Sequence, residues 1–171
     1  MAVAEITHKT GEYVVYKKHG IYEIAEIRKE KIASEFKVYY VLKSVYDKNA
    51  TVYVPADKED LVNQMERVLS KEEIDGIILH SSELSFEWID SNQERFQAME
   101  EIISQGDLTE ILAMMRLLMN KRAEAMAVKA KVFAHDERML AASQKIICEA
   151  FAFTLGIDKK EVLGYIEEKL G

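Results

Sequence analysis

The sequence has little of what marks secreted proteins and all-β proteins. Its 171 residues include one cysteine, one proline and seven glycines. A single cysteine, Cys148, excludes a disulfide framework within the chain, and we expect a buried structural thiol in a reducing compartment. The shortage of proline and glycine means few tight turns, which indicates that much of the chain is helical.

Long apolar runs are also missing. No segment approaches the roughly 18 apolar residues that a membrane-spanning helix requires. The first ten residues carry Glu5 and have no hydrophobic signal-peptide core. We therefore expect a cytoplasmic protein with no membrane partner.

Motifs for catalysis and metal binding are absent as well. The sequence has no HExxH, CxxC, P-loop, GxSxG or GxGxxG pattern, and its four histidines are far apart, at positions 8, 19, 80 and 135. This predicts no catalytic residue, no metal site, no cofactor and no small-molecule substrate. A Ser-His-Asp triad assembled from distant residues leaves no local pattern, so an enzyme stays as the least favoured alternative.

Charge divides the chain into two parts. Residues 1–57 hold 9 Lys/Arg and 8 Asp/Glu, a net charge of +1, whereas residues 58–171 hold 14 and 22, a net charge of −8. The total of −7 argues against indiscriminate binding to nucleic acid. The contrast predicts two domains, which we place at 1–69 and 70–171.

The first part has the pattern of short strands. Aromatic and β-branched residues are typical of strands, and Glu23 and Glu26 lie out of phase with a two-residue repeat, which predicts a bulge. Four or five strands of this length are expected to close as a small SH3-like or Tudor-like barrel. The predicted strands are Glu12–Lys17, Ile21–Arg28, Phe36–Lys43, Thr51–Val54 and Met65–Leu69.

From Ser70 onward the period becomes helical, and four segments have the form of a capping box. They begin at Ser70, Ser91, Asp107 and Asp158, each followed by Glu three residues later. Gly106 and Gly156 stand where a left-handed helix end is expected. The fold class predicted is α+β, a small β-barrel followed by an all-α domain of about five helices. Their expected ranges are 71–80, 92–105, 108–128, 136–155 and 159–169.

Two features of the second part allow a structural and a functional interpretation. Trp88, the only tryptophan, lies in the connector 80–90 and serves either as a packing anchor or as an aromatic wedge for a partner. Residues 116–131 carry a net charge of +4 inside an acidic domain. Those cations either complement a helix end or contact phosphates.

Several segments together resemble a known family. Gly11–Tyr16 with His19-Gly20, then Tyr39–Lys43 and Thr51–Asp57, resemble the opening of CarD-like regulators and the polymerase-binding module of transcription-repair coupling factors. The resemblance continues to about Leu170 and is carried there by Trp88, Arg95, Ser104–Asp107, Asp136–Leu140 and Glu149–Phe151.

The resemblance implies a barrel that docks on the RNA polymerase β subunit through an exposed strand. It also implies a helical domain at the upstream edge of the promoter bubble, with Trp88 in the minor groove. We assign polymerase binding to Arg28, Lys29, Lys31 and Tyr53. We assign DNA binding to Trp88, Arg95, Lys121, Arg122, Lys129 and Lys131.

One departure from the family pattern limits the expected DNA contact. The segment after Trp88, Ile89–Glu94, has two acidic residues and no basic residue. Relatives that bind DNA tightly tend to be basic in this segment. Promoter DNA is therefore expected to bind weakly outside the polymerase complex, with residues 116–131 contacting phosphates. The main alternative is a Tudor/SH3-like adaptor whose helical domain binds a protein and has no direct role on DNA.

Overall fold

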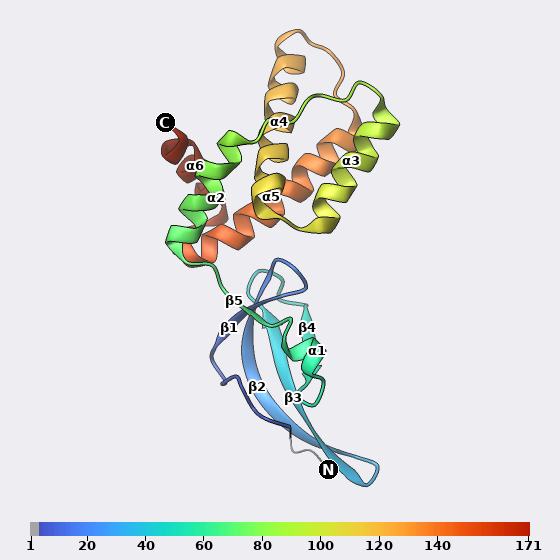
Figure 1. Ribbon diagram of the computed structural model, residues 1–171, viewed down its shortest axis with the longest axis vertical. Coiled ribbons are helices and arrows are strands. Elements are labelled where there is room, and N and C mark those ends of the chain that lie inside the picture. The colour runs from blue at the N-terminus through green and yellow to red at the C-terminus, as the bar shows by residue number, and fades with distance from the viewer. Residues whose placement is uncertain (1–3) are drawn as a thin grey trace. The chain divides into compact units, whose positions relative to one another are not determined.

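The computed structural model describes residues 4–171, and the chain divides into two compact units (Figure 1). The first unit ends at Val68, and the second is Leu69–Gly171. The boundary predicted from charge and period lies at residue 69/70. Each unit is described by itself below.

The first unit is built on one antiparallel sheet of five strands in the order β4-β3-β2-β1-β5. Figure 1 shows β2 and β3, the two longest strands, running side by side to the turn that joins them. The predicted bulge is confirmed, because the β2–β3 register shifts between Ile24 and Glu26. The strands are β1 (Tyr13–Tyr16), β2 (Gly20–Ile32), β3 (Glu35–Ser44), β4 (Thr51–Pro55) and β5 (Glu66–Arg67).

The sheet is open, so the predicted closed barrel is not confirmed. Strands β4 and β5 are the two ends of the sheet order and do not pair with each other. The segment between them forms a short helix, α1 (Glu59–Val62), which was not predicted. Leu61, Val62 and Met65 pack against the core of the sheet, so this segment covers the apolar face that strand closure would otherwise bury.

Gly20 begins β2 directly after the turn of residues 17–19. In that turn Lys17 and Lys18 have positive φ angles. A Cβ atom at Gly20 would lie 2.6 Å from the Tyr22 ring and 2.9 Å from the Tyr16 carbonyl oxygen. The glycine therefore permits a close approach that any other side chain would block.

The core of this unit lies on one face of the sheet. Ile24, Tyr40, Leu42 and Val54 are fully buried there. The Tyr40 hydroxyl accepts a hydrogen bond from the backbone N–H of Thr7 at 3.0 Å, which satisfies a polar group that burial would otherwise penalise.

The second unit contains five α-helices, as the sequence predicts. The short 3₁₀ turn η1 (Lys159–Glu161) precedes the last of them. The first helix runs three residues past its predicted end, so the connector to the next helix starts at Leu84. The helices are α2 (Lys71–Glu83), α3 (Asn92–Gln105), α4 (Leu108–Ala127), α5 (Ala134–Leu155) and α6 (Val162–Leu170).

The caps predicted at four helix starts and two helix ends are confirmed, although α5 begins two residues before its predicted start. Ser70, Ser91 and Asp107 each accept a backbone N–H from the Glu three residues later, and Asp158 forms a reciprocal capping box with Glu161. Gly106 and Gly156 are left-handed, with φ of 79° and 64°.

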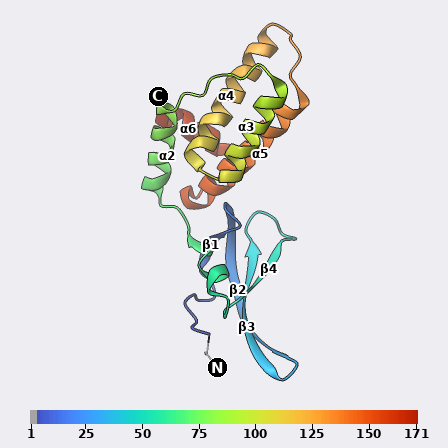
Figure 2. The same cartoon turned by 45° about the vertical axis from the view of Figure 1, so that its right-hand side comes forward.

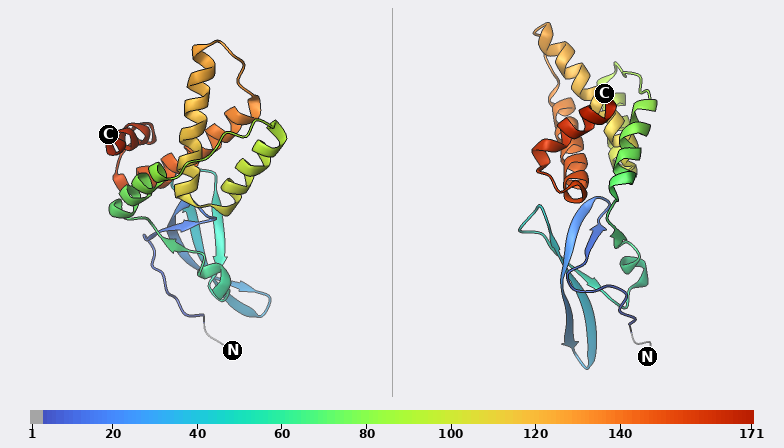
Figure 3. Two further views of the ribbon diagram at one scale, coloured as in Figure 1. Left: turned by 45° about the horizontal axis from the view of Figure 1, so that its top comes forward. Right: turned by 90° about the vertical axis from the view of Figure 1, so that its left-hand side faces the viewer.

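Helix α4 is the centre of the helical unit and contacts α2, α3 and α5. For this reason Ala113 and Met114 are buried along with Ile111, Leu112, Met115 and Leu118. Figures 2 and 3 show α3 beside α5, and α2 beside α6. The connector 84–91 between α2 and α3 carries Trp88.

Within residues 4–171, no single helix has the length and hydropathy to cross a bilayer. Only α5 taken together with residues 159–170 meets that test of length and composition, as a pair bent by 105°.

Candidate functional site

The four predicted polymerase-binding residues lie on two different faces of the sheet. Past the bulge at Ala25, side chains of β2 alternate, so Arg28 points to the face opposite the core. Tyr53 of β4 shares that face, and the Arg28 guanidinium carbon lies 5.7 Å from its ring centroid.

Lys29 and Lys31 point to the other face, beyond the core, near the β2–β3 turn. Their ammonium nitrogens lie 4.7 and 6.0 Å from the ring centroid of Phe36. Phe36 is 63% exposed, so its ring and the two ammonium groups form one solvent-accessible surface. Phe36 was not predicted as a contact residue, because an aromatic residue in a strand segment is common and does not indicate a surface position.

Arg28 is held by carboxylates on its own strand. Its Nε and Nη2 atoms donate to the two Glu26 oxygens at 3.1 and 2.9 Å, and Glu30 lies 3.6 Å away. The hydrogen bond from Arg28 lowers the pKa of Glu26, and in return it raises the pKa of Arg28. Both groups are therefore charged at neutral pH, which fixes the direction of the guanidinium.

Strand β4 is an edge of the sheet. Its residues pair with β3 from Tyr39↔Pro55 to Lys43↔Thr51, and no strand among residues 4–171 pairs with its other side. An unpaired strand edge is a template for a strand from another protein. Tyr53 of this strand is 52% exposed, so the edge carries an aromatic contact residue.

In the helical unit, the connector residue Trp88 is half-buried and stands next to two cations. The Arg95 guanidinium carbon lies 4.5 Å from its ring centroid, and the Lys121 ammonium nitrogen lies 5.5 Å from it. Both distances are in the range of cation–π attraction. The indole is therefore held in place by charges from α3 and α4.

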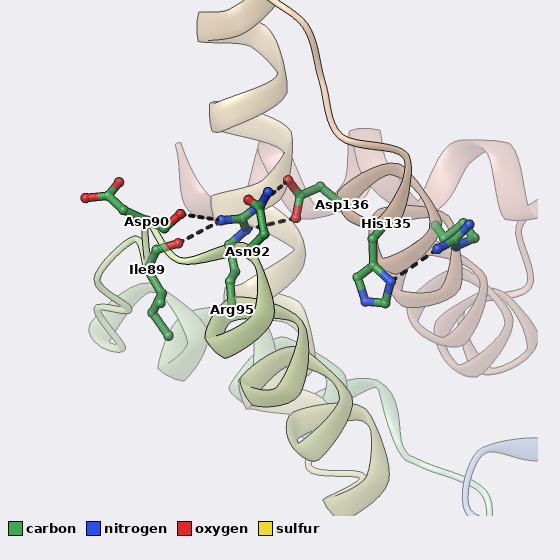
Figure 4. A network of polar contacts seen from close by, with 7 residues as sticks. Ile89, Asp90, Asn92, Arg95, His135 and Asp136 are labelled. Carbon is green, nitrogen blue, oxygen red and sulfur yellow. Dashed lines mark hydrogen bonds and ion pairs between the residues drawn. The ribbon is translucent and has the colours of Figure 1, made fainter.

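Arg95 is a buried positioning residue. Its side chain is 3% exposed and forms a bidentate ion pair with Asp136 of α5, at 2.9 Å for both bonds (Figure 4). The remaining N–H groups donate to the Asn92 side chain at 2.7 Å and to the carbonyl oxygens of Ile89 and Asp90 at 2.8 and 3.4 Å.

The prediction of Arg95 as a DNA contact does not fit this placement. All five guanidinium N–H groups have partners inside the protein, and the side chain has almost no surface for a phosphate. Instead, Arg95 of α3 links the end of the connector to α5 through its hydrogen bonds and its ion pair. It thereby positions Trp88. The partners Asn92 and Asp136 were missed. Asn92 precedes Arg95 by three residues on one helix, and this spacing could have predicted their contact. Asp136 is 41 residues away in the sequence, so no local pattern indicates its contact with Arg95.

Three of the predicted cations meet Trp88 around one open cavity of about 150 Å³, called the Trp88 pocket here. The cavity is lined by Lys121, Arg122 and Lys131 but not by Lys129. The floor is mostly apolar, and Phe133 adds a second aromatic ring. The lining residues are Trp88, Leu118, Lys121, Arg122, Ala125, Lys131, Val132, Phe133, Asp136, Glu137 and Leu140.

The charges around the Trp88 pocket are partly paired. Arg122 Nε lies 2.9 Å from Glu137, and Lys121 lies 3.3 Å from Glu124. Lys131 is exposed and has no ion pair among residues 4–171. Since Asp136 is neutralised by Arg95, cations outnumber carboxylates at this opening.

No metal centre accompanies these surfaces in the described part of the chain, where no three His, Cys, Asp or Glu residues cluster. Cys148 is partly buried on α5, and its burial raises the pKa of its thiol. A thiol of this kind stays protonated at neutral pH and is a poor nucleophile.

Comparison with known families identifies the sheet unit. Residues 8–69 match the CarD-like/TRCF RID domain, a family of RNA polymerase-interacting domains. The match covers β1 to β5 and includes Arg28, Lys29, Lys31 and Tyr53. It supports a polymerase-binding transcription factor. Over these residues, the N-terminal unit of this chain is therefore similar to the CarD-like/TRCF RID domain family.

Proposed function

We propose that this protein is a regulator of transcription initiation that binds the β subunit of RNA polymerase and modulates the stability of the promoter open complex. The observation that carries the proposal is the match of residues 8–69 to RNA polymerase-interacting domains. In this proposal the sheet supplies affinity for the polymerase, and the helical unit acts on promoter DNA with Trp88 near the upstream edge of the bubble.

The free edge of β4 is the proposed docking element. A strand of the β subunit adds to it through backbone hydrogen bonds, and side chains beside the edge give specificity. Arg28 of β2 and Tyr53 of the edge strand lie on the same face of the sheet, so a partner strand that carries an acidic residue fits this face. Lys29 and Lys31 serve a second contact around Phe36.

Two double variants test the docking assignment by pull-down of the β subunit. We expect Arg28→Glu with Tyr53→Ala to lower the affinity by at least about tenfold, the loss of one interface hot spot. Lys29→Glu with Lys31→Glu is expected to weaken binding less and in a salt-dependent manner. Unaltered binding by the second variant removes Lys29 and Lys31 from the docking surface, and unaltered binding by both refutes the docking proposal.

On DNA, Trp88 is proposed to act as a wedge. An apolar ring inserted at a distorted base step favours the melted state, because it fills space that opens when bases unstack. Trp88 lines an open cavity and is therefore reachable from solvent. Such a factor shifts the promoter equilibrium only by the difference between its affinities for the open and closed complexes.

The wedge is tested by the lifetime of open complexes after challenge with a competitor. With polymerase bound by the protein, we expect Trp88→Ala to shorten the lifetime several-fold, while pull-down of the β subunit stays unchanged. A lifetime equal to that of the wild type refutes the wedge.

The acidic charge of the helical unit favours a second candidate function. Residues 69–171 hold 12 Lys/Arg and 19 Asp/Glu, a net charge of −7. This unit therefore repels free DNA, and it is suited to bind a protein instead. The adaptor alternative predicts that crosslinking to promoter DNA is absent both with and without polymerase, whereas the regulator requires it when polymerase is present.

A further inference from the structure

Helices α4 and α6 border a groove on the surface of the helical unit. Both helices pack against α2 and against α5, but they do not pack against each other. Since packed helices lie about 8–10 Å apart, the two leave a space between them, which has a volume of about 390 Å³. We call it the α4–α6 groove. None of the residues that line it also lines the Trp88 pocket.

The walls of the α4–α6 groove are apolar stripes that the fold covers only in part. On α6 the stripe is Leu163, Ile166 and Leu170, at the i, i+3 and i+7 spacing of one helix face. On α4 it is Met115 and Met119, one turn apart. Ile166 and Met115 are buried, whereas the other three side chains are only partly buried. An apolar stripe normally faces a packing partner, and in the described part of the chain no helix or strand fills the space between these two.

The dimensions of the groove suit two large apolar side chains. Its volume of about 390 Å³ is more than twice that of an engineered cavity of about 150 Å³ that binds benzene. The stripe from Leu163 to Leu170 extends about 10 Å along α6, whereas side chains one turn apart on a helix are separated by about 6 Å. An entering helix can therefore place two side chains, at i and i+4, in the groove, as in helix-in-groove recognition.

The charges that line the groove distinguish between partners. Arg116 of α4 is partly buried and has no ion pair among the described residues. Burial removes part of its water, so a carboxylate that reaches it forms a stronger bond than on an open surface. Glu167 of α6 is exposed and stays hydrated, so it contributes less. The negative net charge of the whole unit acts over longer distances and is screened by salt. The groove therefore favours a helix that carries a carboxylate beside its apolar side chains.

We infer that the α4–α6 groove is the docking site for an amphipathic α-helix of a partner protein. This helix has two large apolar side chains one turn apart and a carboxylate that pairs with Arg116. It packs against α4 and α6 at once and so fills a place that no helix of the described chain occupies. The inference goes beyond the proposed function and does not depend on it, because the groove shares no residue with the edge strand β4 or with the Trp88 pocket.

The test measures binding of the full chain to a fluorescently labelled peptide that a lactam bridge on its far side holds helical. The acidic peptide has two leucines four residues apart, a glutamate beside them, and alanine and glutamine elsewhere. In one matched peptide alanine replaces both leucines, and in the other glutamine replaces the glutamate. By fluorescence anisotropy we expect the acidic peptide to bind at least about tenfold more tightly than the peptide without leucines, the effect of burying two leucine side chains. It is expected to bind several-fold more tightly than the peptide with glutamine, because a charged acceptor strengthens the bond to a guanidinium.

The variant Arg116→Gln shows whether the guanidinium recognises the carboxylate. We expect this variant to bind the acidic peptide and the glutamine peptide equally, because the pairing that separates them is lost. Lys145→Gln is the control, since it removes an exposed lysine of α5 outside the groove. It is expected to keep the several-fold difference between the two peptides.

The variant Asn120→Phe shows whether the leucines enter the groove. Asn120 is exposed and lines the groove, so a phenylalanine there fills the space without disturbing the core. We expect this variant to lose the preference for the acidic peptide over the peptide without leucines. Ala123→Phe, at an exposed position further along α4 and outside the lining, is expected to retain that preference. Circular dichroism checks that both variants are folded.

Four results overturn the inference. Equal affinity of the wild type for the peptides with and without leucines shows that the apolar stripes are not a docking surface. A preference for leucine that survives in folded Asn120→Phe places the peptide elsewhere. Equal loss of acidic-peptide binding in Arg116→Gln and Lys145→Gln reduces the charge effect to a general attraction. Self-association of the full chain in analytical ultracentrifugation, abolished by Asn120→Phe and retained by Ala123→Phe, assigns the groove to a second copy of this chain.

Discussion

An arginine–carboxylate pair stands at the candidate site of each unit, and the two pairs differ mainly in burial. Arg28 binds Glu26 at 3.1 and 2.9 Å, and Arg95 binds Asp136 at 2.9 and 2.9 Å. The side chains are 37% and 50% exposed in the first pair but 3% and 8% exposed in the second. The two ion pairs therefore have nearly the same bond lengths, although one is exposed to solvent and the other lies in the protein interior.

The difference in burial assigns the two arginines different tasks. A surface ion pair contributes about 0–1 kcal/mol to stability, so Arg28 remains available to a partner. Breaking a buried pair costs about 3–5 kcal/mol, because it leaves a charge without compensation. Arg95 is therefore part of the fold, and its effect on function passes through the position of Trp88.

The largest effect is expected for Asp136→Ala. This substitution leaves the Arg95 guanidinium buried and unpaired, so we expect the helical unit to lose about 3–5 kcal/mol of unfolding free energy. Urea unfolding followed by Trp88 fluorescence measures it, since the only tryptophan reports on this unit.

The neighbouring substitution Glu137→Ala is the control for Asp136→Ala. Glu137 is 39% exposed and pairs with Arg122, so its loss is expected to cost less than about 1 kcal/mol. Equal losses for the two variants contradict the distinction between buried and exposed pairs.

An intermediate effect is expected at a contact between α2 and α6. The Tyr165 hydroxyl donates to Asp75 at 2.5 Å, and the Asp75 side chain is 26% exposed. We expect Tyr165→Phe to cost about 1 kcal/mol, the usual contribution of one hydrogen bond.

The pH dependence of that loss is a further check. The hydrogen bond from Tyr165 lowers the pKa of Asp75 below its ordinary value of 3.8. A lowered folded-state pKa stabilises the protein above the unfolded-state value, and this contribution disappears as pH falls through the folded-state pKa. The difference between wild type and Tyr165→Phe is therefore expected to be smaller at about pH 3 than at about pH 7. A constant difference contradicts the assignment.

The features that the sequence predicted correctly depend on residues close together in the chain. The helix starts at Ser70, Ser91 and Asp107 involve atoms three residues apart, and the bulge near Glu23 and Glu26 follows from a break in alternation along one strand. These signals are local, so they can be detected without knowing the tertiary contacts.

The features that were missed depend on distant parts of the chain. Whether β4 and β5 pair depends on how residues 56–65 pack on the core, which no local pattern encodes. The role of Arg95 depends on Asp136, 41 residues away. In contrast, Trp88, Lys121, Arg122 and Lys131 were all proposed from the sequence and line one cavity, because an aromatic residue and a basic cluster stand out in an acidic domain.

The smallest effect on stability, and the clearest separation of stability from binding, is expected for Glu26→Gln. The Arg28–Glu26 pair is exposed, so its loss is expected to leave the unfolding free energy close to that of the wild type. Binding to the β subunit is expected to become tighter, because the guanidinium no longer has to leave Glu26 in order to pair with an acidic residue of the partner. Chemical unfolding and quantitative pull-down measure the two quantities on the same sample. Weaker binding indicates that Glu26 itself contacts the partner, and a loss of stability as large as that of Asp136→Ala removes the contrast between the two arginines.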